Sequence, residues 1–475
     1  MHKHTKIIVT IGPASDSVDT IRKLYEAGMN VARLNFSHGD HNYFSKVISN
    51  IRKVSKEIGI LLDTKGPEIR TGKSFLPIRL IEGNEMTLTN KGEFCNDKTL
   101  VVKYPKIDNL NIGDELLIDD GLILVRVVSK ENGILRVKII EGGELSSNKS
   151  VTIKGHNVEL PFLSMQDKKD VKFGMRMGVD FIAASFVRSK KDIVHLRKFV
   201  GNSKLMLISK IEHWKAIENL DQIISESDGI MIARGDLGVE ISLERVPKLQ
   251  HEIIQKCNDL AKPVIVATQM LESMRNNLRP TRAEVSDVAQ AILQGADAVM
   301  LSGETTIGKY PVQAVQMMAR IAREYDHRVD TKISKRLSSS SINEKIAQFV
   351  TEAAFFASKN LGVKAILTPT ETGFTARHVS RFKPRCPILA LTRSMSVFRQ
   401  LQISWGVHPV AESERITKLD DMIKYLVRVS FKKGFVEKED VVLVTAGHKL
   451  HQKGHTNLLE IHKVDDVLSG RVSHR

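Results

Sequence analysis

The sequence has few cysteines and no long apolar run, and both absences narrow the classes of protein that it can encode. Its three cysteines, Cys95, Cys257 and Cys386, lie far apart and have no spacing typical of a metal site or a redox pair. We interpret them as free thiols, which favours a reducing, cytoplasmic compartment. No apolar run approaches the roughly 20 residues of a membrane span, so no membrane partner is expected. The short run from Ile7 to Ile11 is followed by the polar segment GPAS, which predicts a first strand rather than a signal peptide.

Aromatic residues are also scarce, at 5% of the chain, and none interleaves with the short basic runs. Sites for single-stranded nucleic acid typically combine basic side chains with aromatic platforms. The formal net charge of +16 therefore does not by itself predict a nucleic-acid partner, although a basic nucleic-acid-binding protein is the non-enzymatic alternative. Lysine and arginine are spread over nearly every predicted helix, which favours a solvated basic surface that attracts small anions.

What the sequence does contain is a regular alternation of short apolar segments with amphipathic helical patterns. Near-continuous apolar strands that alternate with helices are typical of a parallel sheet covered by helices. Eight such units predict an α/β fold with a closed (β/α)8 TIM barrel. The predicted barrel strands are KIIVTIG, NVARLNFS, GILLDTKG, DFIAASFV, KLMLISKIE, GIMIARGDLG, PVIVATQM and AVMLSGET.

The alternation is interrupted once and ends before the C-terminus, as expected for a chain of 475 residues with several domains. Within residues 71–154, turn signals separate the short strands EMTLTN, DELLID, LILVRVVS and ILRVKIIEGGEL, which predicts an inserted all-β domain that caps the barrel as a lid. Residues 1–70 and 155–332 then form the two parts of the barrel. After the polar segment TKISKRLSSSS, residues 333–475 predict a C-terminal open α/β domain. Its predicted strands are KAILTPT, PILALT, GVHPVA, VVLVTAG and NLLEIHKV.

Charged and hydroxyl side chains gather where the predicted barrel strands end. Lys210 and Glu212 are two apart and share one face of the fifth strand, although lysine and glutamate are seldom buried unless paired. An isolated pair of this kind would be structural. Polar groups at many other strand ends favour a site instead, because catalytic groups of such barrels lie at the carboxyl ends of the strands. These groups are Arg33, Asn35, Ser37, Asp63, Thr64, Lys65, Glu68, Arg70, Ser185, Arg188, Arg234, Asp236, Thr268, Gln269, Ser302 and Glu304.

The residue types at these strand ends indicate their chemistry. Glu212 and Asp236 on neighbouring strands suit a hard divalent cation such as Mg²⁺. Arg33 and Lys210 supply cations for a phosphoryl group in transfer, and Gly235 with Asp236 exposes backbone N–H groups that could hold a carboxylate. No histidine–nucleophile pair and no phosphate-binding glycine loop stands out. The site therefore predicts metal-assisted phosphoryl transfer, or enolate chemistry, on a small anionic substrate. A monovalent cation would suit the oxygens of Asn35, Ser37, Asp63 and Thr64.

The same stretches closely resemble pyruvate kinase, in family order and over essentially the whole chain. The motifs are TKIIVTIGPAS, MNVARLNFSHGDH, LLDTKGPEIRTG, SKIE, GIMIARGDLGVEI, VIVATQMLESM, RPTRAEVSDVAQAILQGADAVMLSGET and KPRCPILALT. The resemblance implies transfer of a phosphoryl group from phosphoenolpyruvate to ADP as the last step of glycolysis. It also implies Mg²⁺ (or Mn²⁺) and K⁺ as cofactors, a homotetramer and a phosphorylated allosteric effector. A metal-dependent aldolase is the alternative enzyme, but it would explain neither the insertion nor the C-terminal domain.

Matched by motif, the resemblance also implies roles for single residues. Arg33 and Lys210 would contact the substrate phosphate, and Thr268, with Gly235, would contact the substrate near the face where the enolate is protonated. Glu212 and Asp236 would hold the divalent ion. The K⁺ ligands would be Asn35, Ser37, Asp63 and Thr64.

The nucleotide site and the K⁺-dependent branch of the family are implied by the same comparison. Arg70 and Lys149 would contact the nucleotide phosphates, with His38 beside them. Glu68 resembles the bacterial-like, K⁺-dependent branch, because the K⁺-independent branch carries a lysine there. The alternative interpretation is that Glu68 merely pairs with Arg70 or Lys65.

Two segments depart from the family pattern. In KSVTIKGHNVELP, Ser150, Thr152 and Lys154 replace the glycine, asparagine and proline of the family, which bears on the hinge of the lid and on the role of Lys149. In the C-terminal domain, residues 370–376 keep a Thr/Gly-rich helix start of the kind that favours anions. The alternative is a capped helix that binds nothing. Positive charge for an effector site would come from Lys449, Lys453 and His455.

Overall fold

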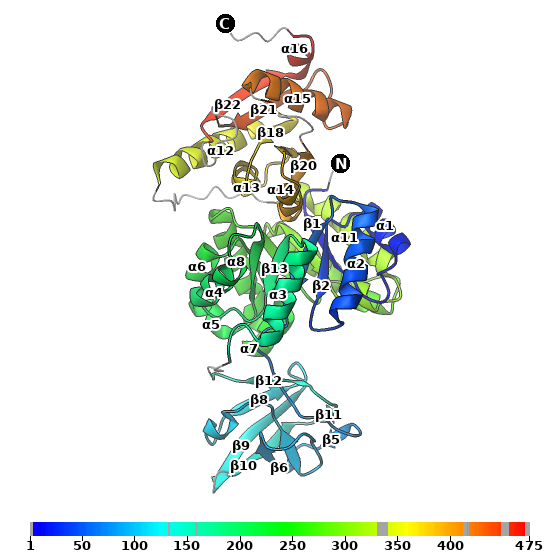
Figure 1. Ribbon diagram of the computed structural model, residues 1–475, viewed down its shortest axis with the longest axis vertical. Helices are drawn as coiled ribbons and strands as arrows, with labels where there is room; N and C mark the ends of the chain where they lie inside the picture. The colour runs from blue at the N-terminus through cyan, green and yellow to red at the C-terminus, as the bar shows by residue number, and fades with distance from the viewer. Residues whose placement is uncertain are drawn as a thin grey trace.

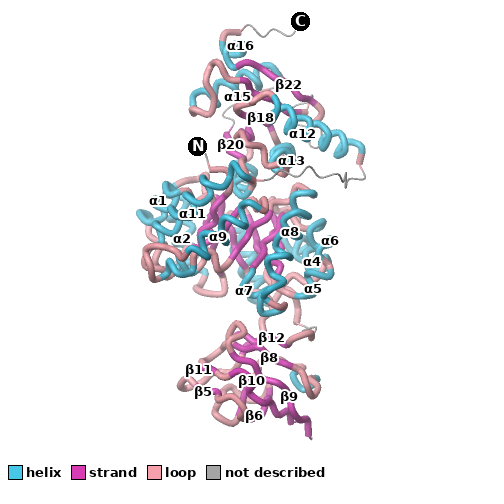
Figure 2. The backbone as a smooth tube through the Cα atoms, turned by 180° about the vertical axis from the view of Figure 1, so that it is seen from behind, coloured by secondary structure: helices cyan, strands magenta, loops and turns pink. Residues whose placement is uncertain are grey.

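The structure is a computed structural model, which describes residues 3–131, 134–156, 160–329, 341–411, 416, 418–447 and 456–470. Figure 1 shows three bodies along the long axis of the molecule, with the helix-covered barrel between an all-β body and a C-terminal α/β body. The same arrangement is seen from behind in Figure 2. No helix among the described residues is both long and apolar enough to cross a lipid bilayer.

The central body is a closed barrel of eight parallel strands, which confirms the predicted fold. The strands follow one another around the barrel in the order β1, β17, β16, β15, β14, β13, β3, β2. Almost every position in them is buried, as expected for strands that pack against a core inside and helices outside. Their bounds are β1 Lys6–Thr10, β2 Val31–Asn35, β3 Gly59–Asp63, β13 Phe181–Ala184, β14 Met206–Ile211, β15 Gly229–Ala233, β16 Val264–Ala267 and β17 Ala298–Leu301.

Helices surround the barrel, and some of them begin at residues whose side chains accept from free backbone N–H groups. Ser164 and Asp167 form a capping box at the start of α3, and Thr281 and Glu284 form another at the start of α9. The left-handed Gly178 ends α3. The helices are α1 Val18–Ala27, α2 His41–Val54, α3 Met165–Met177, α4 Lys190–Val200, α5 Trp214–Glu218, α6 Leu220–Glu226, α7 Arg234–Glu240, α8 Val246–Asp259, α9 Arg282–Leu293, α10 Gly303–Thr306 and α11 Pro311–Tyr325.

The inserted body is built around a sheet with its own apolar core. Its strand order is β4-β12-β8-β9-β10-β6-β7, and β11 pairs with β5 beside it. The sequence predicted β6, β8, β9, β10 and β11 but missed the other strands, which are short or lie in segments with turn residues. The bounds are β4 Ile69–Arg70, β5 Ile78–Leu80, β6 Glu85–Thr89, β7 Thr99–Val101, β8 Glu115–Ile118, β9 Ile123–Glu131, β10 Ile134–Glu141, β11 Gly143–Leu145 and β12 Ser150–Ile153.

The C-terminal body has a five-stranded sheet in the order β20-β19-β18-β21-β22, in which only β22 runs antiparallel to its neighbour. All five strands were predicted from the sequence, as was the long helix α12. The polar segment before α12 falls almost wholly on residues 330–340, outside the described residues. The bounds are α12 Ile342–Asn360, β18 Ala365–Pro369, α13 Phe374–Ser380, β19 Ile388–Thr392, α14 Met395–Gln400, β20 Val407–Ala411, α15 Leu419–Lys432, β21 Val441–Ala446, β22 Leu458–Lys463 and α16 Val464–Leu468.

Candidate active site

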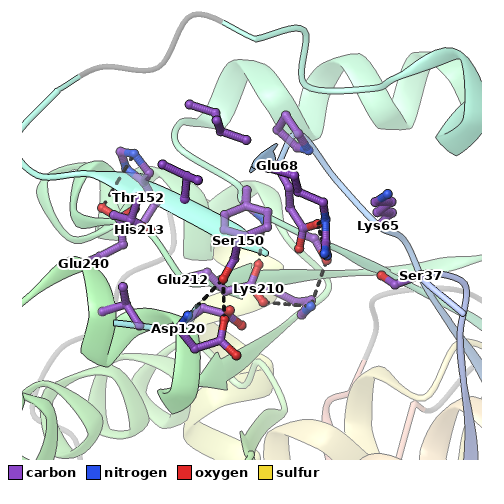
Figure 3. A pocket seen from close by; sticks show the side chains of 18 of the residues that line it. Ser37, Lys65, Glu68, Asp120, Ser150, Thr152, Lys210, Glu212, His213 and Glu240 are labelled. Atoms are coloured by element: carbon purple, nitrogen blue, oxygen red, sulfur yellow. Dashed lines mark hydrogen bonds and ion pairs between the residues drawn. The ribbon is translucent and has the colours of Figure 1, made fainter. Parts of the chain in front are cut away.

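A cavity of about 470 Å³ lies between the carboxyl ends of the barrel strands and the inserted body. Figure 3 shows its lining, to which the barrel contributes Lys210 and Glu212 and the inserted body contributes Asp120, Ser150 and Thr152. Thr268 and Gly235 lie beside this cavity rather than among its lining residues, and Gly235 directly precedes the lining residue Asp236. Most of the strand-end residues predicted from the sequence line this cavity, but Asp63, Arg234, Gln269, Ser302 and Glu304 are not among its lining residues.

Lys210 lies at the centre of a buried group of polar side chains at the ends of β3, β13 and β14. Its Nζ atom is 2.7 Å from Glu212 Oε1 and 3.1 Å from Asp63 Oδ1, and it donates a 2.8 Å hydrogen bond to Ser185 Oγ. Only 8% of Lys210 and none of Asp63 or Glu212 is exposed to solvent. Lys210 and Glu212 therefore point the same way because each neutralises the other inside the barrel mouth.

Arg33, at the end of β2, completes this group. Its Nε and Nη2 atoms both lie 2.7 Å from Asp63 Oδ2, and its Nη1 atom donates to Thr10 Oγ1 at 2.9 Å. These contacts fix the guanidinium in one orientation. Three N–H contacts from Arg33 and Lys210 therefore hold this one carboxylate. Ser185 Oγ also lies 3.2 Å from Asp63 Oδ1, but its single proton goes to the nearer Thr64 carbonyl at 2.6 Å.

The electrostatics of the group follow from burial and from its neighbouring charges. Burial alone would lower the pKa of Lys210, but Asp63 and Glu212 outweigh it and raise that pKa, so the ammonium stays charged. Burial would raise the pKa of Asp63, yet Lys210 and Arg33 hold it below its usual range. For Glu212, burial raises the pKa to about 7, with Asp236 and Asp63 adding to the rise against the opposing effect of Lys210.

Asp236 is the second carboxylate of the predicted divalent-ion pair, in the first turn of α7. Its pKa is raised, chiefly by burial and further by the nearby Asp120 and Glu68. Together, Glu212 and Asp236 concentrate negative charge that a bound cation would stabilise. Among the described residues, no group of three or more histidine, cysteine, aspartate or glutamate side chains is arranged to hold a metal ion. Two carboxylates that leave the remaining positions to water and substrate oxygens are typical of Mg²⁺ sites.

Thr268 follows β16 and adopts a strained backbone conformation. Its φ is +67° and that of Gln269 is +52°, a region that a β-branched residue rarely adopts. The Arg234 guanidinium holds the turn, since its Nη2 atom donates to the Thr268 and Gln269 carbonyls at 2.7 and 3.1 Å. Thr268 Oγ1 in turn accepts a 2.8 Å hydrogen bond from the backbone N–H of Gly235. Strain of this kind is concentrated at functional sites.

The opposite side of the cavity carries the residues that the resemblance assigned to the nucleotide. Arg70 Nη2 lies 2.6 Å from Glu68 Oε2, so Glu68 makes the arginine pair considered as its alternative role. Lys149 Nζ lies 2.9 Å from Asp119 Oδ1. Both pairs lie within the same cavity lining, together with the exposed His38.

The oxygens suggested for a monovalent cation also line or adjoin this cavity. Asn35 Oδ1 accepts the Ser37 backbone N–H at 3.1 Å, and the Thr64 carbonyl accepts Ser185 Oγ at 2.6 Å. Asn35, Ser37 and Thr64 line the cavity directly, and Asp63 is reached through its contacts with Arg33 and Lys210. The four residues therefore lie around one end of the buried group.

The segment that departs from the family pattern forms the regular strand β12. Ser150 Oγ donates to Asp120 Oδ1 at 2.6 Å and accepts the Asp120 backbone N–H at 3.0 Å, while Lys154 Nζ lies 3.0 Å from Glu115 Oε2. Thr152 lines the cavity. The substituted residues thus make contacts within the inserted body, and residues 157–159 of the segment lie outside the described part of the chain.

Some lining residues were not foreseen in the sequence as part of the site. Asp119 and Asp120 stood in a DDG segment that indicated only a turn. His213 and Glu240 follow strand-end motifs, and their side chains lie 3.8 Å apart, Nε2 to Oε2, at the far side of the cavity (Figure 3). Their positions in the sequence could have indicated them, since His213 directly follows Glu212 and Glu240 lies four residues after Asp236.

The suggested effector helix in the C-terminal body is short. Gly373 precedes it with a φ of +79°, and the Gly373 backbone N–H donates to Thr370 Oγ1 at 2.9 Å. This contact closes the turn before the helix, and α13 has no side-chain cap, so neither an effector site nor the capped start considered as its alternative is decided. Lys449, Lys453 and His455 lie outside the described residues, so their part in an effector site stays a prediction.

Comparisons with known proteins agree with this geometry. The family model described as "Pyruvate kinase, barrel domain" matches residues 2–315, and "Pyruvate kinase, alpha/beta domain" matches residues 348–462. The chain is 45% identical to a pyruvate kinase of Sporosarcina psychrophila, over 98% of this chain and 81% of the relative. It is 44% identical to one of Geobacillus stearothermophilus, over 99% of this chain and 82% of that protein. The chain belongs to the pyruvate kinase family.

Proposed function

We propose that this enzyme transfers the phosphoryl group of phosphoenolpyruvate to ADP, giving pyruvate and ATP, at the cavity between the barrel and the inserted lid. The observation that carries the proposal is the buried group of Arg33, Asp63, Lys210 and Glu212 at the strand ends. Preorganised cations in a water-poor site stabilise the charge that develops on a phosphoryl group in transfer. The reaction also accounts for the carboxylates beside them.

In this proposal, Lys210 and Arg33 bind the phosphoryl oxygens and orient them. Both cations are held by Asp63, so neither has to be reorganised when the phosphoryl group moves. Thr268 and Gly235 lie next to the enolate and its carboxylate, and the Thr268 hydroxyl, held by the Gly235 N–H, positions the proton that converts the enolate to pyruvate. The strained turn at Thr268 supports this role because it fixes the hydroxyl in one place.

Glu212 and Asp236 would hold the divalent ion, Mg²⁺ or Mn²⁺. The raised pKa of each carboxylate supports the assignment, because burial without a bound cation disfavours their charged forms. When bound, such an ion neutralises charge on the phosphoryl and enolate oxygens. Lys210 keeps Glu212 oriented through the 2.7 Å contact.

Asn35, Ser37, Asp63 and Thr64 would hold K⁺. The chemistry of the donor set fits a monovalent cation, since it offers three neutral side chains and one carboxylate. Because Arg33 and Lys210 already make three N–H contacts with the Asp63 carboxylate, K⁺ would share that carboxylate with both side chains. The Glu68–Arg70 pair lies in the lining of the same cavity, so the charge at residue 68 acts on the same site.

Arg70, Lys149 and His38 would contact the nucleotide. Each of the two cations is only partly buried and is paired with one carboxylate, so an ADP phosphate can replace that partner at little cost. We also propose the domain boundaries at residues 70, 154 and 332. The first two place the hinge of the lid beside Arg70 and Lys154.

An assembly of several copies, a homotetramer by family resemblance, is supported by α12. This helix exposes a group of large apolar side chains, each at least 40% accessible to solvent, and such patches mark surfaces that contact another protein. They are Ile342, Ile346, Phe349 and Phe356.

A phosphorylated effector bound at residues 370–376 is proposed with Lys453 as its partner. A cytoplasmic location is supported by three buried, unpaired cysteines.

The experiment that tests the proposed reaction is an assay of pyruvate formation, coupled to lactate dehydrogenase, with phosphoenolpyruvate, ADP, Mg²⁺ and K⁺. We expect turnover that requires both substrates. A metal-dependent aldolase would instead form or cleave a carbon–carbon bond and show no dependence on ADP. Absence of ADP-dependent pyruvate formation by the folded enzyme would contradict the proposal.

A further inference from the structure

A second, much smaller cavity lies where the barrel meets the C-terminal body, before the amino ends of β16 and β17, whereas the active site lies at the carboxyl ends of the barrel strands. The centre of a water-sized sphere can move within about 10 Å³ of this cavity. A space of that size holds one water molecule or one ion of similar radius. The barrel contributes the end of α8, the loop residues Ala261, Lys262 and Pro263 before β16, and Asp297 before β17. The C-terminal body contributes α13 and the residue after the short 3₁₀ turn Leu401–Ile403.

Several polar atoms of this lining are buried without a hydrogen-bond partner among the described residues. They are Asn258 Oδ1, Arg377 Nη1, Arg381 Nε and Ser404 Oγ. Arg381 is 8% exposed and Ser404 is 1% exposed, so neither side chain can turn to bulk water. Buried polar groups nearly always have a partner, and a group without one in the protein is often satisfied by a bound water or ion.

The lining also carries an excess of positive charge. Within the described ranges, no carboxylate lies within ion-pair distance of Lys262, Arg377 or Arg381. Asp297 of the lining pairs with Lys383 at 2.8 Å, and Asp228, which acts on Lys262 and Arg377 from a longer distance, pairs with Arg197 at 3.2 Å. Asp259 and Glu352 act on Arg381, also from beyond ion-pair distance. Lys262 donates only to backbone carbonyls, those of Ser225 and Ser227.

The pKa values of the titratable groups around the cavity reflect its burial and its positive charge. Burial lowers the pKa of His378 to about 3, and Arg381, Arg377 and Lys262 lower it further, against the effect of the Phe374 carbonyl. Burial likewise lowers the pKa of Arg377 and of Arg381. Leaving arginine charges buried and unpaired is costly, whereas a bound counter-charge would offset the cost.

We propose that this cavity binds one small inorganic anion of about halide size, held by the Arg377, Arg381 and Ser404 donors, which links the barrel to the C-terminal body. A neutral water molecule would fill the space and satisfy the donors, but it would leave the charge of the arginines uncompensated. Of the unpaired atoms only Asn258 Oδ1 cannot donate, and its amide can rotate to present Nδ2 to the anion, at the loss of its 3.2 Å bond to the Gly295 carbonyl. The Asp297 carboxylate also lines the cavity, and it accepts from Lys383 Nζ and from the backbone N–H groups of Trp405 and Val264. Because the anion contacts both α8 and α13, it would stabilise the attachment of the C-terminal body.

Bromide is the probe, because its anomalous scattering distinguishes it from water. We expect crystals of the full chain grown in sodium bromide to show an anomalous peak in this cavity, within hydrogen-bonding reach of Arg381 Nε and Ser404 Oγ. A water-like density without anomalous signal, or bromide bound only at scattered surface positions, would overturn the proposal.

Thermal unfolding in solution provides the second measurement. At constant ionic strength, replacing a bulky organic anion with bromide should raise the unfolding midpoint of the parent protein with a saturable dependence. In Arg381→Gln the apparent affinity should fall roughly tenfold to a hundredfold, the effect of one charge-assisted hydrogen bond. Arg385→Gln is the matched control, since Arg385 is exposed on the same segment and should leave the bromide dependence unchanged.

Ser404→Ala is a second variant for the same measurement, which serves if Arg381→Gln does not fold. Ser404 Oγ has no hydrogen-bond partner in the described part of the chain, so its removal breaks no hydrogen bond seen there, and bromide should bind roughly threefold to tenfold more weakly. Equal bromide dependence in the parent, Arg381→Gln and Ser404→Ala proteins would contradict the proposal.

Discussion

The two sides of the active-site cavity hold their charges in different ways. On the barrel side, the side chains of Lys210 and Asp63 are 11% and 1% exposed, and each has several polar partners. On the lid side, Arg70 and Glu68 are 33% and 19% exposed, as are Lys149 and Asp119, and each carboxylate pairs mainly with one cation. The barrel side therefore has a fixed network, and the lid side has separate ion pairs.

This difference indicates a division of labour. Breaking a buried pair typically costs about 3–5 kcal/mol, so the barrel side keeps its geometry through the reaction. A partly exposed pair costs less to break than a buried one, since fully exposed pairs contribute at most about 1 kcal/mol, so a nucleotide phosphate can take the place of Glu68 or Asp119. We therefore expect changes on the barrel side to reduce turnover, and changes on the lid side to reduce nucleotide affinity.

The largest effect is expected for Glu212→Gln, which removes a fully buried carboxylate from the fixed network. The variant should bind Mn²⁺ at least about a hundredfold more weakly, since even an indirect ligand partner is worth roughly tenfold to a hundredfold. Electron paramagnetic resonance of free Mn²⁺ measures this without reference to activity. The control is Glu240→Gln, a cavity carboxylate whose pKa burial also raises to about 7. Equal Mn²⁺ affinity in both variants would refute the assignment of Glu212.

The next effect concerns proton delivery in Thr268→Ala. Tritium exchange between water and the methyl group of pyruvate should fall roughly a hundredfold, the lower range of acid–base contributions, while phosphoryl transfer falls less. Alanine keeps the cost of a positive φ, so the change isolates the hydroxyl. Gln269→Ala, at the adjacent residue with positive φ, should leave exchange near the parent value. Exchange and turnover that both match the parent enzyme would remove Thr268 from the mechanism.

Glu68→Lys reverses the charge of residue 68 in the active-site cavity. Glu68 adds negative charge to a cavity that already contains Asp63, so we expect K⁺ to activate the parent enzyme strongly and the variant much less. Initial rates in K⁺ and in a bulky organic cation are compared at constant ionic strength, because ionic strength alone changes surface interactions. Glu82→Lys, an exposed change of equal charge, should keep the K⁺ dependence. Equal parent rates in the two salts would disprove the proposed K⁺ site.

The smallest effect is expected for Lys149→Met on the lid side. The variant loses one partly exposed cation and its pair with Asp119, so KM for ADP should rise by up to about tenfold while kcat stays within a few-fold of the parent. Steady-state rates at varied ADP measure the two separately. A large fall in kcat with unchanged KM would place Lys149 in the fixed network instead.

Much of this arrangement could be predicted from the sequence because it follows from local patterns. The apolar strands defined the barrel, and the two-residue spacing of Lys210 and Glu212 placed both side chains on one face, as the structure confirms. The contacts across the lid could not be predicted, because they depend on how a separate β body sits over the barrel. Asp120 thus indicated only a turn, and the strand at Ser150 was missed.

The strained backbone at Thr268 and the contacts of Ser185 with several side chains could not be predicted from the sequence either. The left-handed conformation of Thr268 is set by Arg234, which reaches the turn from the next strand end, and no local pattern indicates it. Ser185 was identified at a strand end, but its contacts with Lys210 and Asp63 require the closed order of β3, β13 and β14.

The most direct test of the division between the two sides is the turnover of Lys210→Met, measured at saturating phosphoenolpyruvate, ADP, Mg²⁺ and K⁺ beside Lys149→Met. Removing one preorganised donor typically costs roughly a hundredfold to a thousandfold in rate. We predict a fall of this size in kcat for Lys210→Met and a kcat within a few-fold of the parent for Lys149→Met. Near-normal turnover of Lys210→Met would contradict the account.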